Sequence, residues 1–178
     1  SETEKAREVV RELEKRNDEV HKETRDVVRR LEETSDEVSK DSERKVDRLR
    51  EEVKKVRDDG KVDDKLVKDV EDKLKKVTDE DRRLNEEAKK ELRRVVEEDR
   101  RSVEESRKRL EEVVRLVEDG KDVEELIRRM EKLTEDNERR SRKLIEELKR
   151  LLEDLREKSE RLIRELERLV KELRDRAE

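Results

Sequence analysis

Three residues of this chain have the side chains of a hydrolytic site. His21 is the only histidine, and Asp99 and Ser141 supply an aspartate and a serine. An imidazole held by a carboxylate can activate a serine hydroxyl as a nucleophile. The chain has no cysteine, so it offers no thiol nucleophile, thiolate metal site or disulfide. Whether the three side chains can meet depends on the elements that carry them.

The composition favours long helices. Charged residues make up 62% of the chain and hydrophobic residues 27%, with no proline and no aromatic residue. High charge with few aromatics is also found in disordered chains, so the periodicity must decide between the two. Apolar residues recur in steps of four and three, and the pattern repeats every 18 residues, as at Val10, Val28 and Val46. Eighteen residues in five turns is the period of a straight α-helix, which predicts ordered, nearly straight helices.

Two glycines divide the helical pattern into three. Gly60 and Gly120 are the only glycines, and they lie in the similar stretches VRDDGKVDD and VEDGKDVEE. A glycine just past a helix supplies the left-handed residue that ends it, and Asp63 and Asp122 can cap the helices that follow. We therefore expect helices at about residues 2–58, 63–118 and 122–177, each roughly 85 Å long at about 1.5 Å per residue. The expected fold is all-α: a single domain over residues 1–178, an elongated, nearly straight, antiparallel up-down-up three-helix bundle with an 18-residue core repeat.

The polar residues that interrupt the apolar stripes fall at matching levels in this bundle. Around Gly60, facing residues have numbers that sum to about 120, and around Gly120 the sum is about 239. His21 then lies level with Asp99 and Ser141, and Asn17 lies level with Ser102 and Asn137. A first band contains Asn17, His21, Thr24, Asp99, Ser102, Ser106, Thr134, Asn137 and Ser141. A second band contains Ser35, Ser39, Ser42, Thr78, Asp81, Asn85 and Ser159, with Ser39 expected to meet Asp81 and Ser159, Ser35 to meet Asn85, and Ser42 to meet Thr78.

We interpret the bands as structural hydrogen-bond networks rather than as a catalytic site. A buried polar group left unpaired costs about 1–3 kcal/mol, so aligned donors and acceptors penalise any register that separates them. An 18-residue repeat needs such a device, because sliding one helix by a whole repeat would otherwise pack nearly as well. A triad needs an exposed nucleophile, an oxyanion hole and a pocket, none of which the pattern predicts. One histidine with separated carboxylates is also not a metal-ligand set.

The regular 18-residue period, the duplicated glycine turns, the missing aromatics and the aligned polar residues resemble de novo designed, parametrically generated helical bundles with buried hydrogen-bond networks. The resemblance covers the whole chain and implies a designed structural scaffold with no natural biochemical activity and no cofactor. Natural coiled coils and spectrin-like repeats are the alternatives, but spectrin-like repeats carry aromatics and irregular loops. Because the chain opens with Ser1 rather than methionine, we also expect a processed, recombinant protein.

The sequence gives little reason to expect macromolecular partners. The net charge is −5, both signs are interspersed throughout, and no aromatics are present to stack on bases, which argues against nucleic-acid binding. No apolar run exceeds two residues, so a membrane span is not expected, and no targeting signal is recognisable. We expect a soluble protein of unassigned location.

A second apolar stripe on the third helix leaves one alternative open. It contains Ile127, Ile145, Ile163, Thr134, Leu152 and Val170, and it follows the same 18-residue repeat. If it widens the core face, the chain is a monomer without partners. If it is exposed, the chain is an interaction component that forms a homo-oligomer or accepts a partner helix. We expect the monomeric scaffold.

Overall fold

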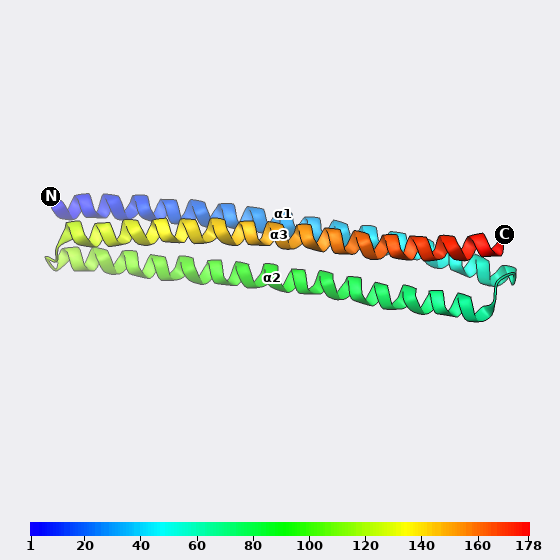
Figure 1. Cartoon of the computed structure of the whole chain (residues 1–178). Helices are drawn as coiled ribbons and strands as arrows, with labels where there is room; N and C mark the ends of the chain where they lie inside the picture. The colour runs from blue at the N-terminus through cyan, green and yellow to red at the C-terminus, as the bar shows by residue number, and fades with distance from the viewer. The chain divides into compact units, whose positions relative to one another are not determined.

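The computed structural model describes all residues, 1–178, and contains three helices and no strand. The helices are α1 (Glu2–Asp59), α2 (Asp64–Glu118) and α3 (Val123–Ala177), joined by two short turns (Figure 1). The chain is an all-α three-helix bundle, as predicted. Each helix end lies within one residue of the position expected from the sequence.

Short polar residues open the helices. The Glu4 backbone N–H donates to Ser1 Oγ at 3.3 Å, and the Lys65 N–H donates to Asp63 Oδ1 at 3.3 Å. These bonds satisfy donors that the first turn of a helix leaves without an intrahelical partner. At α3 the backbone carbonyl of Asp122 accepts from the Leu126 N–H at 3.2 Å. Acidic residues in every first turn also complement the positive end of the helix dipole.

Both turns depend on a glycine with positive φ. Gly60 has φ 63° and Gly120 has φ 79°, and no other residue has positive φ. At the end of α2 the Gly120 N–H donates to the Val117 carbonyl and the Lys121 N–H donates to the Leu116 carbonyl, at 3.1 Å each. This is the Schellman arrangement, in which a left-handed residue lets the chain turn back onto the last carbonyls of the helix.

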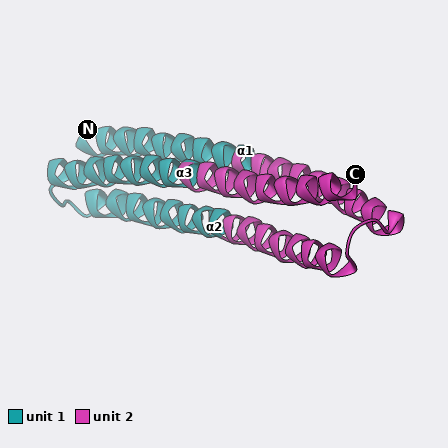
Figure 2. Ribbon diagram, turned by 45° about the vertical axis from the view of Figure 1, so that its right-hand side comes forward, with its two compact units in different colours: residues 1–30, 91–149 teal, residues 31–90, 150–178 magenta.

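The chain divides into two compact units, each containing a segment of every helix (Figure 2). Unit 1 contains residues 1–30 and 91–149, and unit 2 contains residues 31–90 and 150–178. In unit 1, Arg7 pairs with Glu118 and Asp18 pairs with Arg107, so numbers fall along α2 as they rise along α1. The segments of α1 and α2 are therefore antiparallel there.

The same directions hold in unit 2. Asp36 pairs with Lys89, and Arg57 pairs with Glu71, which again makes α1 and α2 antiparallel. Ser42 and Ser159 are hydrogen-bonded, and Glu52 pairs with Arg174 further along both helices, so α1 and α3 are parallel. Each unit is an up-down-up arrangement of three helical segments.

Aliphatic side chains form the core of each unit. In unit 1 the buried cluster contains Ala6, Val10, Leu13, Leu110, Val113 and Val117, with Leu126, Ile127 and Met130 of α3 packed against it. In unit 2 the main cluster contains Val46, Leu49, Val53, Val56, Val67, Val70, Leu74, Ile163, Leu166, Val170 and Leu173, and a smaller one contains Ala88, Leu152 and Leu155. In α2 the buried positions follow the predicted 18-residue repeat, as at Leu74, Leu92 and Leu110. In α3 the residues Leu126, Leu144 and Leu162, which have the same spacing, are half-buried.

The second apolar stripe of α3 lies mostly inside the units. Thr134, Leu152, Ile163 and Val170 are buried, whereas Ile127 and Ile145 are half-buried. No large hydrophobic side chain is exposed anywhere in the structure. Four of the six residues thus widen the core face of the helix, as is usual for a helix packed against two others. None of the helices is long and apolar enough to cross a membrane.

Replacing Gly60 with valine should destabilise the bundle through backbone strain alone. A Cβ at this position would meet no atom within 4 Å, so no clash contributes. A left-handed conformation costs a residue with a Cβ about 1–2 kcal/mol. Urea unfolding should therefore give a lower midpoint for Gly60→Val than for Lys61→Val, the neighbouring exposed control. Equal midpoints for the two variants would contradict the role assigned to the glycine.

Candidate functional site

His21 and Asp99 are joined across two helices of unit 1. The Nδ1 of His21, on α1, is hydrogen-bonded to Oδ2 of Asp99, on α2. The His21 side chain keeps 18% of its surface exposed and that of Asp99 only 6%. The imidazole N–H donates to the carboxylate, which fixes the ring and leaves Nε2 as its remaining polar atom.

Burial dominates the electrostatics of Asp99. Removal from water raises the pKa of its carboxyl group, because desolvation disfavours the charged form. His21 and Arg25, both on α1, oppose this shift because their positive charge and the His21 hydrogen bond favour the carboxylate. The raised pKa of Asp99 therefore reflects its removal from water, which His21 and Arg25 only partly offset.

Ser141 does not complete a catalytic triad with this pair. It is half-buried on α3 and lines a small cavity together with His21 and Asp99, but no hydrogen bond joins it to His21. The cavity measures about 10 Å³. Pockets that bind small organic molecules usually measure about 300–1,000 Å³. The space beside His21 suits a water molecule, not a substrate.

Elsewhere in the first band, one hydrogen bond joins α2 and α3. Asn137 Nδ2, on α3, donates to Ser106 Oγ, on α2, at 2.6 Å. The sequence placed Asn137 level with Asn17 and Ser102 instead, one helical turn away on α2. Asn17 is buried and Ser102 half-buried, and both line the cavity beside His21.

The two threonines of the first band are both buried, but neither forms a hydrogen bond to another helix. Thr24 Oγ1 donates to the Val20 carbonyl of its own helix at 2.9 Å. A hydroxyl satisfied by the preceding turn needs no partner on another helix. Thr134 is buried on α3.

In unit 2 a chain of hydrogen bonds links all three helices. Ser159 Oγ, on α3, donates to Asp81 Oδ1, on α2, at 2.6 Å, and it lies 2.9 Å from Ser42 Oγ, on α1. A hydroxyl has one proton, and Ser159 gives its proton to the carboxylate. Ser42 must therefore donate to Ser159, so the chain runs from Ser42 through Ser159 to Asp81. All three side chains are buried.

The register of this band differs from the sequence prediction by one turn of α1. The prediction placed Ser39 opposite Asp81 and Ser159, but Ser39 is half-buried and Ser42 takes that position. Ser42 belongs to the inward-facing stripe of α1, and Ser39 lies beside it. The apolar periodicity of α1, which includes position 42 but not position 39, is the sequence signal that distinguishes the two serines.

The other polar residues of unit 2 bond within their own helix or not at all. Thr78 Oγ1 donates to the Leu74 carbonyl at 2.6 Å rather than to Ser42, and Asn85 Nδ2 donates to the Asp81 carbonyl at 3.0 Å. Ser35 Oγ and Asn85 Oδ1 are buried without a hydrogen-bond partner. Ser35 and Asn85, which the sequence places at the same level, are therefore not hydrogen-bonded to each other through these atoms. Each unpaired atom carries a desolvation cost of about 1–3 kcal/mol.

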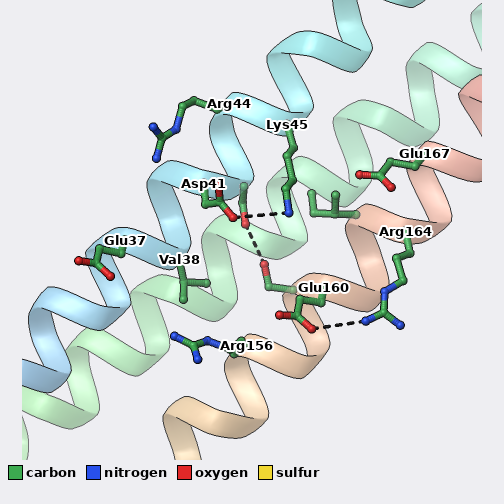
Figure 3. A pocket seen from close by; sticks show the side chains of 12 residues that line it. Glu37, Val38, Asp41, Arg44, Lys45, Arg156, Glu160, Arg164 and Glu167 are labelled. Carbon is green, nitrogen blue, oxygen red and sulfur yellow. Dashed lines mark hydrogen bonds and ion pairs between the residues drawn. The ribbon is translucent and has the colours of Figure 1, made fainter.

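A groove between α1 and α3 in unit 2 has a volume of about 850 Å³ (Figure 3). Its rim is charged, and within it Lys45 pairs with Asp41 and Arg164 pairs with Glu160. Four acidic and four basic side chains line it, so the rim favours a ligand of neither sign. The acidic residues are Glu37, Asp41, Glu160 and Glu167, and the basic ones are Arg44, Lys45, Arg156 and Arg164.

Neither a metal centre nor a known relative identifies the site. No cluster of three or more His, Asp and Glu side chains has an arrangement that could hold a metal ion. Comparison of the chain with protein-family models, with curated proteins and with solved structures gave no match.

Removing Ser159 should destabilise the bundle more than removing Ser42. Ser159→Ala takes the donor from the buried Asp81 carboxylate and the acceptor from Ser42, leaving two groups unpaired at about 1–3 kcal/mol each. Ser42→Ala removes only the first donor of the chain and leaves the bond to Asp81 in place. Chemical denaturation of the two variants and the parent gives the order. A Ser42→Ala variant that is the less stable of the two would contradict the assigned direction of the hydrogen bonds.

The raised pKa of Asp99 predicts a specific pH dependence. A carboxyl whose pKa is higher in the folded than in the unfolded state binds its proton more tightly when folded. Its contribution to stability is therefore fully present below the unfolded value, near 3.8, and is lost as the pH rises through the folded pKa. The unfolding free energy of the parent minus that of Asp99→Asn should decrease over this range. A difference that is flat or that rises would show that burial is not the dominant effect.

Proposed function

We propose that this chain is a structural scaffold without enzymatic activity, whose fold is specified by apolar layers and by buried polar networks. The observation that best supports this proposal is that polar residues on the inward-facing stripes form hydrogen bonds with side chains of other helices. His21 bonds to Asp99 in unit 1, and Ser159 joins Ser42 and Asp81 in unit 2. Side chains arranged this way stabilise one pairing of the helices, because other pairings would leave them unmatched.

The space around these groups supports a structural role over a catalytic one. The cavity beside His21 and Asp99 measures about 10 Å³. Ser42 and Ser159 line the groove between α1 and α3, but both side chains are buried and their hydroxyls are committed to the chain that ends on Asp81. A catalytic group must reach a substrate, and a nucleophile needs donors that stabilise the developing oxyanion. Buried polar groups whose hydrogen-bonding capacity is taken up by other helices are best explained by their effect on folding.

We further propose that the sequence is a de novo design. Three features support this origin: the 18-residue repeat on all three helices, the pair of similar glycine turns and the complete absence of aromatic residues and proline. The failure of all three comparisons to find a relative is consistent with a sequence that did not descend from a natural family.

The alternative function, association with a second copy or a partner helix through the extra stripe of α3, has less support. Thr134, Leu152, Ile163 and Val170 of this stripe are buried within their own units. A surface for association would be expected to offer a contiguous exposed apolar patch. Only Ile127 and Ile145 remain half-buried.

The proposal is tested by comparing a broken polar pair with a removed one. Asp99→Leu leaves the His21 ring without its acceptor, at a cost of about 1–3 kcal/mol. The double variant His21→Leu, Asp99→Leu removes both partners, and replacing a buried polar pair by packed hydrophobes is often neutral or stabilising. In denaturant unfolding, the single variant should be less stable than the double. An Asp99→Leu variant as stable as the parent would remove the basis of the proposal.

The second measurement tests the register of α1 against α2. If the His21–Asp99 pair contributed only to stability, its removal would leave this register unchanged. The chain has no cysteine, so Arg11→Cys on α1 and Lys108→Cys on α2, both exposed, can carry spin labels in unit 1. The labelled parent should give one narrow distance distribution. The same labels in the double variant should give a broader distribution or a second one, because the apolar repeat no longer distinguishes neighbouring registers. An unchanged narrow distribution would show that the pair does not specify the fold.

A further inference from the structure

The small cavity of unit 1 is lined mainly by polar side chains. It measures about 10 Å³ and receives residues from all three helices: Asn17, Val20 and His21 of α1, Asp99, Ser102, Val103 and Ser106 of α2, and Asn137 and Ser141 of α3. Seven of these nine residues are polar. A cavity needs roughly 10–15 Å³ and two to four polar partners to hold one water molecule. The volume lies at the lower end of that range and the lining exceeds the requirement.

The hydrogen bonds within the protein use only part of this polar lining. His21 Nδ1 is committed to Asp99, and Asn137 Nδ2 is committed to Ser106 Oγ. The side chains of Asn17, Ser102 and Ser141 form no hydrogen bond with the protein, although Asn17 is only 7% exposed. An amide offers two donors and an acceptor, and a hydroxyl offers one donor and two acceptor positions. One group with unused capacity is thus present on each of the three helices.

We propose that this cavity is a binding site for a single ordered water molecule that links α1, α2 and α3 in unit 1. Water supplies two donors and two acceptors, so it can bond Asn17, Ser102 and Ser141 at once. It matches the mixture of donors and acceptors around the cavity, which a purely anionic or cationic ligand would not. The proposal is independent of the scaffold function proposed above.

The site is tested on the isotopically labelled full-length chain by water–protein nuclear Overhauser effects. The methyl groups of Val20 and Val103 line the cavity and carry no exchangeable protons, so an effect at them comes from a neighbouring proton at the water frequency. Serine hydroxyl protons that exchange with water can relay the same effect, and the Asn17→Leu variant, which keeps these serines, separates the two sources. A bound, long-lived water gives the valine methyl groups an effect of the sign found within a macromolecule, whereas passing solvent does not. The Leu110 methyl groups, buried in the same unit but outside this cavity, should show no such effect.

Two variants separate the site from general hydration. Asn17→Leu removes one polar partner and fills the cavity with an aliphatic side chain, so the signal at Val20 and Val103 should disappear. Thr24→Val, a matched polar-to-apolar change at a buried residue outside the cavity, should leave it intact. Circular dichroism checks that both variants are folded.

The remaining outcomes would overturn the proposal. One is a parent protein without a long-lived water signal at these methyl groups. Another is a signal that persists in Asn17→Leu, which would place the water elsewhere. Loss of the signal in both variants would assign it to the unit as a whole rather than to this cavity.

Discussion

The cost of burying a polar group without a partner governs the arrangement of this molecule. Aliphatic side chains can pack in many registers, but a buried carboxylate or imidazole is tolerated only where its partner lies. Asp81 and Asp99 are both buried on α2, and each is bonded to a side chain on another helix. The two aspartates therefore limit how α2 can pair, one within each unit.

The two units meet this constraint with different chemistry. In unit 1, an imidazole on α1 supplies the donor to Asp99, and Arg25 adds positive charge nearby. In unit 2, Asp81 accepts a hydrogen bond from the neutral hydroxyl of Ser159, which in turn accepts one from Ser42. The first arrangement joins two ionisable side chains, whereas the second contains only one. The units thus share an architecture but not an electrostatic character.

Much of the fold follows from the sequence because its signals are local. The helix ends and the positive φ of Gly60 and Gly120 depend on a few neighbouring residues, and the 18-residue repeat identifies the buried stripes. The level of His21 with Asp99 follows from counting residues away from a turn. The individual hydrogen bonds cannot be predicted by such counting, because side chains one helical turn apart reach similar positions. Ser42 rather than Ser39 meets Ser159, and Ser106 rather than Ser102 meets Asn137, for this reason.

A core built from aliphatic side chains, with no aromatic residue, has a practical consequence. The chain contains no tryptophan, tyrosine or phenylalanine, so it has no intrinsic fluorescence and almost no absorbance at the wavelengths used to quantify proteins. Packing of the interior is equally silent in near-ultraviolet circular dichroism, which depends on aromatic side chains in fixed surroundings. The same property makes the bundle an optically clean host. A single tryptophan introduced at any position in either unit would emit against a dark background and report on its own surroundings alone.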